Sequence, residues 1–251
     1  MIDLKGKRAL VTGGSRGIGA ATALLLAECG ADVGIGYRNR EKDAEDVVRR
    51  IASFGVRGFA HASDLSAPGG TDSLFARAAR EFGGLDLFVG NAGIWPFADI
   101  PVGEMDDDRW HLTMRANMDS MFTTTRAAVR MISDHGRIVL VSSTAGQRGE
   151  AGHSDYAASR GAMISFVKSV AVELAPRDIT VNSVAPGWVD TEMAAQSLEG
   201  DGRAKVERTI PLGRVATAKD IAGPIAFLCS DHARHITGEV LNVNGGSVLC
   251  G

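Results

Sequence analysis

The sequence contains little that would cross-link the chain through disulfides or metal ions, or insert it in a membrane. Its three cysteines, Cys29, Cys229 and Cys250, are odd in number and are not spaced as metal ligands, so we expect free thiols in a reducing compartment. No run of about 18 apolar residues occurs, which argues against a transmembrane helix. The first residues, MIDLKGK, lack the apolar core of a signal peptide. These absences predict a cytoplasmic protein without a membrane partner.

The chain also lacks a marked excess of charge of either sign. It has 27 Lys and Arg residues and 30 Asp and Glu residues, for a formal charge of −3. Nucleic-acid-binding domains usually carry a basic surplus, so we expect no nucleic-acid partner. Aromatic residues make up only 6%, whereas glycine provides 31 of 251 residues, well above the average of roughly 7%. This composition predicts tight turns and close backbone packing.

Short apolar runs alternate with longer amphipathic stretches along the chain. The apolar runs predict seven strands, near Arg8–Thr12, Asp32–Tyr37, Val56–His61, Leu85–Gly90, Arg137–Ser142, Thr180–Ala185 and Val240–Val243. The amphipathic stretches predict six helices, near Gly17–Cys29, Lys42–Phe54, Thr71–Phe82, Arg109–Ile132, Asp155–Ala175 and Ala218–Ser230. Ile138–Val141 is apolar on both faces, as in parallel sheets covered by helices on both sides. We therefore expect one α/β domain over residues 1–251, with a doubly wound parallel sheet.

Residues 187–215 interrupt this alternation. The segment is polar, rich in glycine and weakly helical, and a connection of this length is usually either a functional lid or a disordered insert. Its apolar residues Met193, Leu198, Ile210 and Leu212 favour a lid that packs on an apolar surface.

A glycine-rich turn follows the first predicted strand and opens the first predicted helix. Gly13, Gly17 and Gly19 have the spacing G-x-x-x-G-x-G, a variant of the dinucleotide-binding fingerprint. Glycine permits the sharp turn and a close approach to a pyrophosphate, whose charge is stabilised by the positive end of the helix. A glycine turn without a ligand is the alternative, but the strand before it and the helix after it favour a nucleotide.

The end of the second predicted strand indicates which nucleotide is bound. NAD sites usually place an acidic residue there, about 20 residues beyond the glycines, to bind the ribose 2′-hydroxyl. Here the strand ends in Tyr37–Arg40, with the sequence YRNR. Arg16 and Arg38 would together bind a 2′-phosphate through charge-assisted hydrogen bonds; the alternative is that both arginines merely face solvent. The sequence therefore favours NADP(H) over NAD(H).

Markers spread along nearly the whole chain resemble those of the short-chain dehydrogenase/reductase family. They are the Thr12–Gly19 loop, Asp64-Leu65, Asn91-Ala92-Gly93, Asn117, Ser143, Tyr156, Pro186-Gly187 and Asn244-Gly245-Gly246. The resemblance implies a seven-stranded Rossmann-type sheet, and a homotetramer or homodimer. It also implies that the cofactor is bound by Gly13, Ser15, Arg16, Gly17, Ile18, Gly19, Tyr37, Arg38, Asp64, Leu65, Asn91, Ala92, Gly93, Tyr156, Arg160, Pro186, Gly187, Val189 and Thr191.

The resemblance assigns the chemistry to Ser143, Tyr156 and Asn117. An isolated tyrosine has a pKa of about 10, so Tyr156 needs a nearby cation to act as an acid or base near neutral pH. Ser143 would hydrogen-bond the substrate oxygen, and Asn117 would interrupt its helix and hold a water of a proton relay. The plainer alternatives are a serine that caps a helix and a tyrosine that only packs.

The chain departs from the family at the fourth catalytic position. The family motif is Tyr-x-x-x-Lys, whereas this chain has Arg160 four residues after Tyr156. That spacing places a cation on the same helix face as the tyrosine, but arginine is larger, planar and differently hydrated than lysine. Three hypotheses follow: an active enzyme that tolerates arginine, a weakened enzyme, or a nucleotide-binding protein without turnover.

Within the family, Ile210–Arg214 and Ile236–Gly246 resemble the branch of 3-oxoacyl-(acyl carrier protein) reductases. Such reductases tend to offer basic residues to an acidic carrier; Arg177 fits this pattern, but Asp134 places a negative charge where another basic residue is expected. The residues expected at the substrate are Trp95, Pro96, Phe97, Gln147, Glu150, His153 and the lid.

We expect an NADP(H)-dependent oxidoreductase that interconverts a carbonyl and a secondary alcohol of a small molecule. The alternatives are a nucleotide-binding scaffold or sensor with weak or no turnover, and an enzyme of the same fold that catalyses dehydration or epimerisation. We expect no metal, because His232 and His235 lack the third ligand that a zinc site requires.

Overall fold

The computed structural model describes residues 2–249, in which seven parallel strands form one sheet. The strands are β1 (Arg8–Thr12), β2 (Asp32–Tyr37), β3 (Gly58–Ala62), β4 (Leu85–Gly90), β5 (Ile132–Val141), β6 (Thr180–Pro186) and β9 (Val240–Val243). Their order in the sheet is β3-β2-β1-β4-β5-β6-β9. The chain adds strands to one side of β1 as far as β3 and then crosses to the other side with β4, so the order switches between β1 and β4. The prediction of a doubly wound, Rossmann-type α/β fold is confirmed, and such folds bind ligands at the point of reversal.

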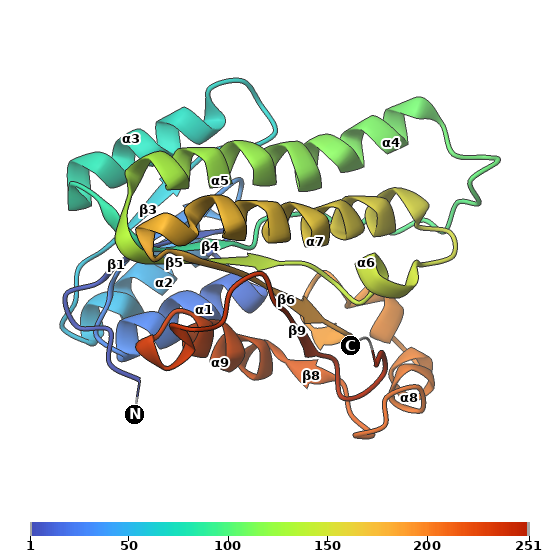
Figure 1. Cartoon of the computed structure of the whole chain (residues 1–251). Coiled ribbons are helices and arrows are strands. Elements are labelled where there is room, and N and C mark those ends of the chain that lie inside the picture. The colour runs from blue at the N-terminus through green and yellow to red at the C-terminus, as the bar shows by residue number, and fades with distance from the viewer. Residues whose placement is uncertain (1, 250–251) are drawn as a thin grey trace.

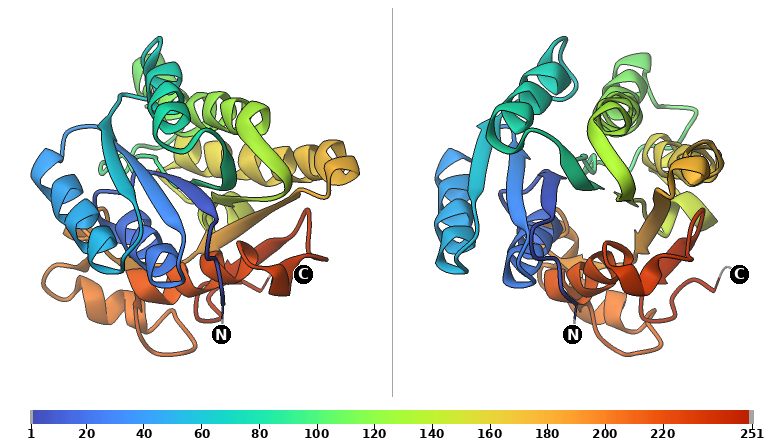
Figure 2. Two further views of the ribbon diagram at one scale, coloured as in Figure 1. Left: turned by 90° about the vertical axis from the view of Figure 1, so that its left-hand side faces the viewer. Right: turned by 60° about the vertical axis from the view of Figure 1, so that its left-hand side comes forward.

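Helices cover both faces of this sheet (Figures 1 and 2). One face is covered by α1 (Gly17–Glu28), α2 (Glu41–Ser53) and α9 (Ala218–Leu228). The other is covered by α3 (Gly70–Phe82), α5 (Ser120–Met131) and α7 (Ser154–Leu174). Three shorter helices, α4 (Asp107–Met114), α6 (Ala145–Arg148) and α8 (Gly202–Glu207), lie outside these two layers or at their ends.

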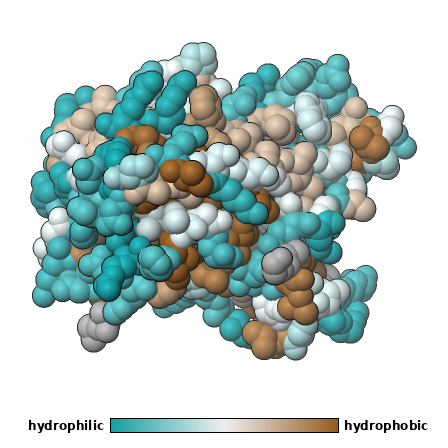
Figure 3. All heavy atoms as spheres, viewed as in Figure 1, coloured by the Kyte–Doolittle hydropathy of each residue, from teal (hydrophilic) through white to brown (hydrophobic). Residues whose placement is uncertain are grey.

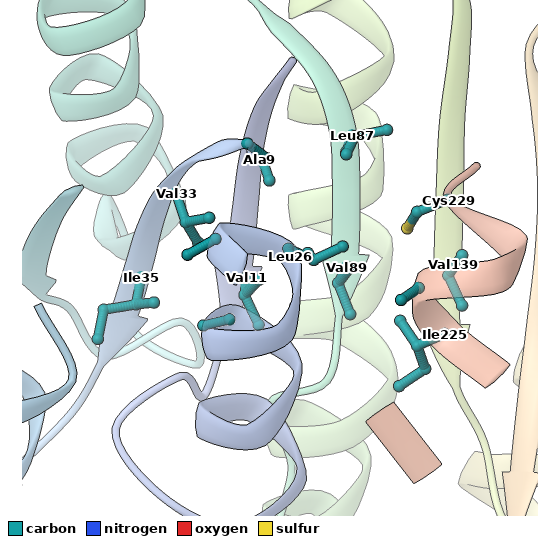
Figure 4. Close-up of a cluster of buried hydrophobic side chains, with 14 of the residues drawn as sticks. Ala9, Val11, Leu26, Val33, Ile35, Leu87, Val89, Val139, Ile225 and Cys229 are labelled. Carbon is teal, nitrogen blue, oxygen red and sulfur yellow. The ribbon is translucent and has the colours of Figure 1, made fainter. Parts of the chain in front are cut away.

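The strands bury alternate side chains in two separate cores. Along β1, Ala9 and Val11 face the first layer of helices and Leu10 faces the second. Figure 4 shows the first core, where strand side chains meet Leu26 of α1 and Ile225 of α9. Burial on both faces explains the continuous apolar runs in the sequence.

The cysteines are free thiols where the structure describes them. Cys229 is buried in the first core, and burial raises the pKa of its thiol to about 12. Cys29 is half-buried on the same side, and Cys250 lies outside the described residues.

Two element predictions are corrected by the structure. The single helix expected over Arg109–Ile132 consists of α4, a π-helical turn over Arg115–Asp119, and α5. In that turn the N–H of Ser120 donates to the carbonyl of Arg115, five residues earlier, and such turns are frequent at functional sites. The fifth strand begins at Ile132 rather than Arg137, because Ile132 pairs with Leu85 before the register shifts.

The predicted lid, residues 187–215, contains more structure than its sequence suggests. The short strands β7 (Val189–Asp190) and β8 (Ala216–Thr217) pair at its base, and α8 lies near its middle. Leu198 and Ile210 are buried in a small apolar cluster formed by the segment itself. Met193 and Leu212 are 41% and 71% exposed.

Two features are missing from residues 2–249: a helix able to span a membrane and a group of metal ligands. None of their helices combines the length and the apolar character needed to cross a bilayer. Within the same range, no three His, Cys, Asp or Glu side chains are grouped as metal ligands.

Candidate active site

Two adjoining cavities lie along the carboxyl ends of the strands. The larger, of about 460 Å³, runs from the glycine turn after β1 to the ends of β2 and β4. The smaller, of about 140 Å³, lies over the ends of β5 and β6 and under the first part of the predicted lid. Ile18, Asn91, Thr191 and Met193 line both, so the two cavities form one elongated groove.

The structure brings almost all predicted cofactor and catalytic residues to this groove. The larger cavity is lined by Gly13, Ser15, Arg16, Gly17, Ile18, Tyr37, Arg38, Asp64, Leu65, Asn91, Ala92, Gly93 and Thr191. The smaller is lined by Ile18, Asn91, Ser143, Tyr156, Arg160, Pro186, Gly187, Val189 and Thr191. Gly19 and Asn117 are buried and line neither cavity.

The glycine turn has the shape of a phosphate cradle. Gly13 and Gly17 have φ of 65° and 55°, in the left-handed region that favours glycine. A Cβ on Gly19 would lie 2.1 Å from the carbonyl oxygen of Gly13, so only glycine lets α1 begin this close to β1. The side-chain amide of Asn91 donates to the carbonyls of Thr12 and Gly13 at 3.0 and 3.2 Å and holds the turn. A pyrophosphate therefore fits here, against the first free N–H groups of α1.

Three arginines line the far end of the larger cavity. Arg16 and Arg38 are the predicted pair, and Arg40 is the third. Arg40 was not predicted as a phosphate ligand, although it stands in the same YRNR segment. Arg38 lies near Asp64, whose pKa is lowered by hydrogen bonds from Ser66 and by Arg38. This end of the groove is therefore rich in guanidinium donors.

Ser143 and Tyr156 meet in the smaller cavity. Ser143 follows β5, and its Oγ accepts a hydrogen bond of 3.1 Å from the N–H of Ala145, which leaves the hydroxyl proton available for donation. Tyr156 stands in the first turn of α7 and is 7% exposed. Trp95 lies edge to face with its ring at a centroid distance of 4.6 Å. The serine and the tyrosine are thus held by two different elements that converge on one cavity.

Arg160 lies one turn of α7 beyond Tyr156 and is 3% exposed. Its Nη1 donates to the carbonyl of Val141 at 3.1 Å, and its Nη2 donates to Oδ1 of Asn117 at 3.4 Å. Its Cζ lies 5.1 Å from the centroid of the Tyr156 ring, within the range of a cation–π contact. The arginine therefore fits between the tyrosine, the end of β5 and the π-helical turn.

Asn117 is fully buried behind this cluster. Its Oδ1 accepts the N–H of Ile94 at 2.8 Å, and its Nδ2 donates to the carbonyl of Ile94 and to Oγ of Ser159. With the Arg160 contact, both ends of the amide have protein partners. Asn117 thereby ties the loop after β4 to α7 and to the guanidinium of Arg160.

The substrate contacts predicted from sequence are only partly present. Trp95 and Glu150 line the smaller cavity, and Trp188 and Met193 reach it from the predicted lid. Four other predicted contacts line neither cavity. They are Pro96, Phe97, which is 57% exposed, Gln147, which donates to Asn242, and His153, which stacks on Trp95 while its Nε2 contacts the carbonyl of Pro96.

A buried ion pair behind Tyr156 was not predicted. Asp155 is fully buried, and its Oδ2 accepts hydrogen bonds from Nε of Arg109 at 2.8 Å and Oγ1 of Thr113 at 2.7 Å. Burial opposes ionisation of Asp155, but these hydrogen bonds outweigh it and hold its pKa below the usual range. The pair joins α4 to the first turn of α7, which carries the tyrosine. Its two residues are 46 positions apart in the sequence, so no local pattern predicts the pair.

The fold and the groove define a nicotinamide-dependent oxidoreductase of the Rossmann type, and comparisons with known proteins identify the family. Residues 13–247 match the family model described as "Enoyl-(Acyl carrier protein) reductase". The chain is 40% identical, over 250 residues, to the 3-oxoacyl-(acyl-carrier-protein) reductase FabG of Escherichia coli K12, covering 99% of this chain and 100% of that protein. The chain belongs to the short-chain dehydrogenase/reductase family.

Two solved structures with bound cofactor resemble the whole chain. A short-chain dehydrogenase from Burkholderia cenocepacia J2315 in complex with NADP has a TM-score of 0.91 and 39% identity, covering 97% of this chain and 98% of that one. A blue fluorescent protein from a metagenomic library, in complex with NADPH, has a TM-score of 0.92 and 36% identity, covering 98% and 100%. The predicted enzyme class and the predicted cofactor, NADP(H), are confirmed by these comparisons.

Proposed function

We propose that this chain reduces a carbonyl of a small molecule to a secondary alcohol with NADPH, and catalyses the reverse oxidation with NADP⁺. The observation that carries the proposal is that Ser143, Tyr156 and Arg160 line the cavity that continues the groove of the glycine turn. When bound there, the cofactor supplies the hydride. Similarity to a 3-oxoacyl reductase supports carbonyl chemistry rather than the enoyl reduction in the family model's description.

Each residue of the cluster has a distinct task in this proposal. The hydroxyl of Ser143 donates a hydrogen bond to the substrate oxygen and so orients the carbonyl. The phenol of Tyr156 gives its proton to that oxygen during reduction and takes it back during oxidation. Arg160, over the tyrosine ring, supplies the positive charge that stabilises the phenolate formed in reduction. Asn117 acts as a positioning residue, because it holds Arg160.

The cofactor assignment follows from the guanidinium groups at the far end of the groove. Arg16, Arg38 and Arg40 line it, and a 2′-phosphate binds such planar donors through charge-assisted hydrogen bonds. No acidic residue stands at the end of β2 to select a ribose 2′-hydroxyl. The arrangement supports NADP(H) for this chain.

The substrate we propose is a free ketone with an apolar or ring-bearing group. Trp95, Trp188 and Met193 provide apolar walls in the smaller cavity. The basic residue expected to receive an acyl carrier protein, Arg177, forms an ion pair with Asp134 at 2.8 Å and donates to two backbone carbonyls. A paired guanidinium beside a carboxylate offers little to an acidic carrier.

We also propose that residues 187–215 form the lid of the substrate cavity and that the chain assembles as a homotetramer or homodimer. Exposed apolar side chains on the outer helices support assembly: Phe122 of α5 is 43% exposed and Val172 of α7 is 77% exposed. In Figure 3, pale and brown residues gather over the region that these two helices occupy in Figure 1. The free thiols Cys29 and Cys229 support a cytoplasmic location.

The test separates the enzyme from a nucleotide-binding scaffold. The protein is titrated with NADPH and NADH by fluorescence and then assayed with β-ketoesters, diketones and quinones, following absorbance of the reduced cofactor. Tyr156→Phe and Ser143→Ala are expected to lower kcat by roughly 10²- to 10⁴-fold with unchanged NADPH affinity. Ser169→Ala, on the exposed face of α7, is the control. Tighter binding of NADH would contradict the cofactor assignment, and silence of both the natural chain and Arg160→Lys on every ketone would favour the scaffold.

A further inference from the structure

A carboxylate of the predicted lid already occupies the arginines of the cofactor groove. Oε2 of Glu192 accepts a hydrogen bond from Nη2 of Arg40 at 2.6 Å and also contacts Nη1 of Arg16. Arg16 precedes α1 in the glycine turn, and Arg40 precedes α2 after the second strand. Glu192 follows β7, 176 residues from Arg16. One carboxylate oxygen therefore joins two arginines of the cofactor groove to the predicted lid.

The neighbouring residues hold Glu192 at this place. Thr191 lies against Gly17, where a Cβ would be 3.3 Å from Cγ2 of Thr191. Asp190 forms an ion pair with Arg203 at 2.7 Å, inside the lid. The carboxylate of Glu192 is thus kept at the wall of the larger cavity by its own segment.

The chemistry of this contact is that of a phosphate site. In this contact two guanidinium groups converge on one anionic oxygen. A phosphate monoester is bound by the same arrangement. Asp43 of α2, 3.9 Å from Arg40, is the other carboxylate within ion-pair distance of these arginines in the described part of the chain. The side chains of Arg16, Arg40 and Glu192 are each about half exposed, at 50%, 51% and 53%, so an incoming anion reaches them directly.

We propose that Glu192 is an internal competitor for the cofactor 2′-phosphate and a latch that fastens the lid to the groove. The inference rests on the proposed preference for NADP(H). A 2′-phosphate needs the donors that Glu192 holds, so its binding releases the carboxylate and with it the beginning of the lid. NADH has no 2′-phosphate and leaves the latch closed. The lid is thereby coupled to one of the two nicotinamide cofactors.

The coupling is reciprocal, because one set of donors serves either anion. The latch lowers the apparent affinity for NADPH and leaves that for NADH unchanged. Removing its charge while keeping its size, in Glu192→Gln, frees both arginines for the phosphate. An exposed ion pair shifts a binding equilibrium by up to about fivefold. Glu192→Gln removes two such pairs with the arginines, and it removes the repulsion between the carboxylate and the 2′-phosphate. We expect the Kd for NADPH to fall by about three- to tenfold.

The experiment is a calorimetric titration of the full chain with NADPH, NADH, adenosine 2′,5′-bisphosphate and 5′-AMP. The variants are Glu192→Gln, Arg40→Gln, their combination, and Glu199→Gln as the control, which makes the same charge change elsewhere in the lid. Glu192→Gln is expected to lower the Kd for NADPH and for the bisphosphate. The Kd for NADH and for 5′-AMP is expected to change by less than about twofold, as for an ordinary surface substitution. The gain is expected to shrink in the Arg40→Gln background.

The outcomes separate the inference from the proposed function. Tighter binding of NADH than NADPH by the natural chain would overturn the cofactor assignment itself. If the natural chain prefers NADPH but Glu192→Gln binds it equally or more weakly, the latch is overturned and the cofactor assignment stands. An equal gain in Glu199→Gln would also overturn the latch, because a general charge effect would then explain the result. Using the bisphosphate locates the effect at the 2′-phosphate without involving the nicotinamide.

Discussion

The guanidinium of Arg160 lies over the ring of Tyr156, with Cζ 5.1 Å from the ring centroid. The family motif has lysine at this position, a compact ammonium in place of a planar fork. In this chain the fork extends past the tyrosine, so that one nitrogen reaches the end of β5 and another reaches the π-helical turn. The larger cation is therefore part of the local packing.

The first prediction concerns the charge and shape of the side chain at position 160. Arg160→Lys is expected to change kcat by less than about tenfold, because lysine keeps the charge but loses the two contacts of the fork. Arg160→Met is expected to lower kcat by about 10²-fold or more, because no cation then stabilises the phenolate of Tyr156. Steady-state rates with one ketone and saturating NADPH provide the measurement. A rise of kcat by 10²-fold or more in Arg160→Lys would instead identify the arginine as a defect.

The second prediction uses Gly93, against which the guanidinium packs. A Cβ on Gly93 would lie 2.2 Å from Nη2 of Arg160 and 2.8 Å from Oδ1 of Asn117. Gly93→Ala is therefore expected to displace the arginine and to lower kcat by about 10²-fold, as for a shift of the catalytic geometry by 1 Å. Gly103→Ala, where a Cβ has open space, is the control.

The same contact predicts a specific rescue. A lysine at position 160 has no Nη2 to collide with the new methyl group, so Gly93→Ala is expected to cost less in the Arg160→Lys background than in the natural chain. A double-mutant cycle on kcat measures the difference. Equal costs in both backgrounds would show that Gly93 acts on the cofactor loop and not through Arg160.

Much of this fold could be predicted from the sequence because its signals are local. Both faces of β1, β4 and β5 are buried, which produces apolar runs that are readable residue by residue. Turn residues and strand ends are equally local, so Gly13, Gly17 and Tyr37 lie where the pattern places them. The helix expected over Arg109–Ile132 was wrong in its middle, because a single wider turn over Arg115–Asp119 is too short to leave a period of its own in the sequence.

The site was less predictable where its contacts join distant segments. Arg40 and Glu192 are 152 residues apart, and Arg109 and Asp155 are 46 apart. A charge in sequence does not indicate which opposite charge it meets, because tertiary packing decides the pairing. The substrate wall was also mispredicted in part: Phe97 is 57% exposed and lines neither cavity, which its apolar side chain in the sequence does not indicate.

The third prediction concerns pH and the buried pair of Asp155 and Arg109. The pKa of Asp155 is lowered in the folded state, whereas an unfolded aspartate titrates at about 3.9. A lowered folded pKa contributes stability that is fully present above the unfolded pKa and is lost as the pH falls through the folded pKa. The free energy of unfolding is therefore expected to lose this contribution only below about pH 4.

Urea unfolding at pH 7, 5, 4 and 3 measures this effect. Asp155→Asn is expected to be less stable than the natural chain at pH 7, and the difference is expected to shrink toward pH 3. Arg109→Met, which leaves a buried carboxylate without its partner, is expected to cost about 3–5 kcal/mol at pH 7. Asp201→Asn, at an exposed site, is the control. A difference for Asp155→Asn that stays constant with pH would contradict the role of its ionisation.

The fourth prediction tests the kind of substrate. Asp134 pairs at 2.8 Å with Arg177, the basic residue that was predicted to receive an acidic carrier. Asp134→Lys frees Arg177 and adds a second cation, so kcat/KM for a 3-oxoacyl group on acyl carrier protein is expected to rise by about five- to tenfold at low salt. The rate with a free β-ketoester is expected to stay the same, because position 134 lies outside both cavities of the groove.

The salt dependence of these rates decides between a free and a carrier-bound substrate. Long-range attraction is screened at high ionic strength, with a Debye length of about 3 Å at 1 M, so the gain from Asp134→Lys is expected to disappear there. Asp46→Lys makes the same charge change on α2, at the opposite face of the sheet, and is expected to give no gain. If the natural chain already prefers the carrier-bound substrate, and loses that preference in salt, a different basic surface receives the carrier. The ion pair of Arg177 with Asp134 would then not exclude an acyl carrier protein as the partner.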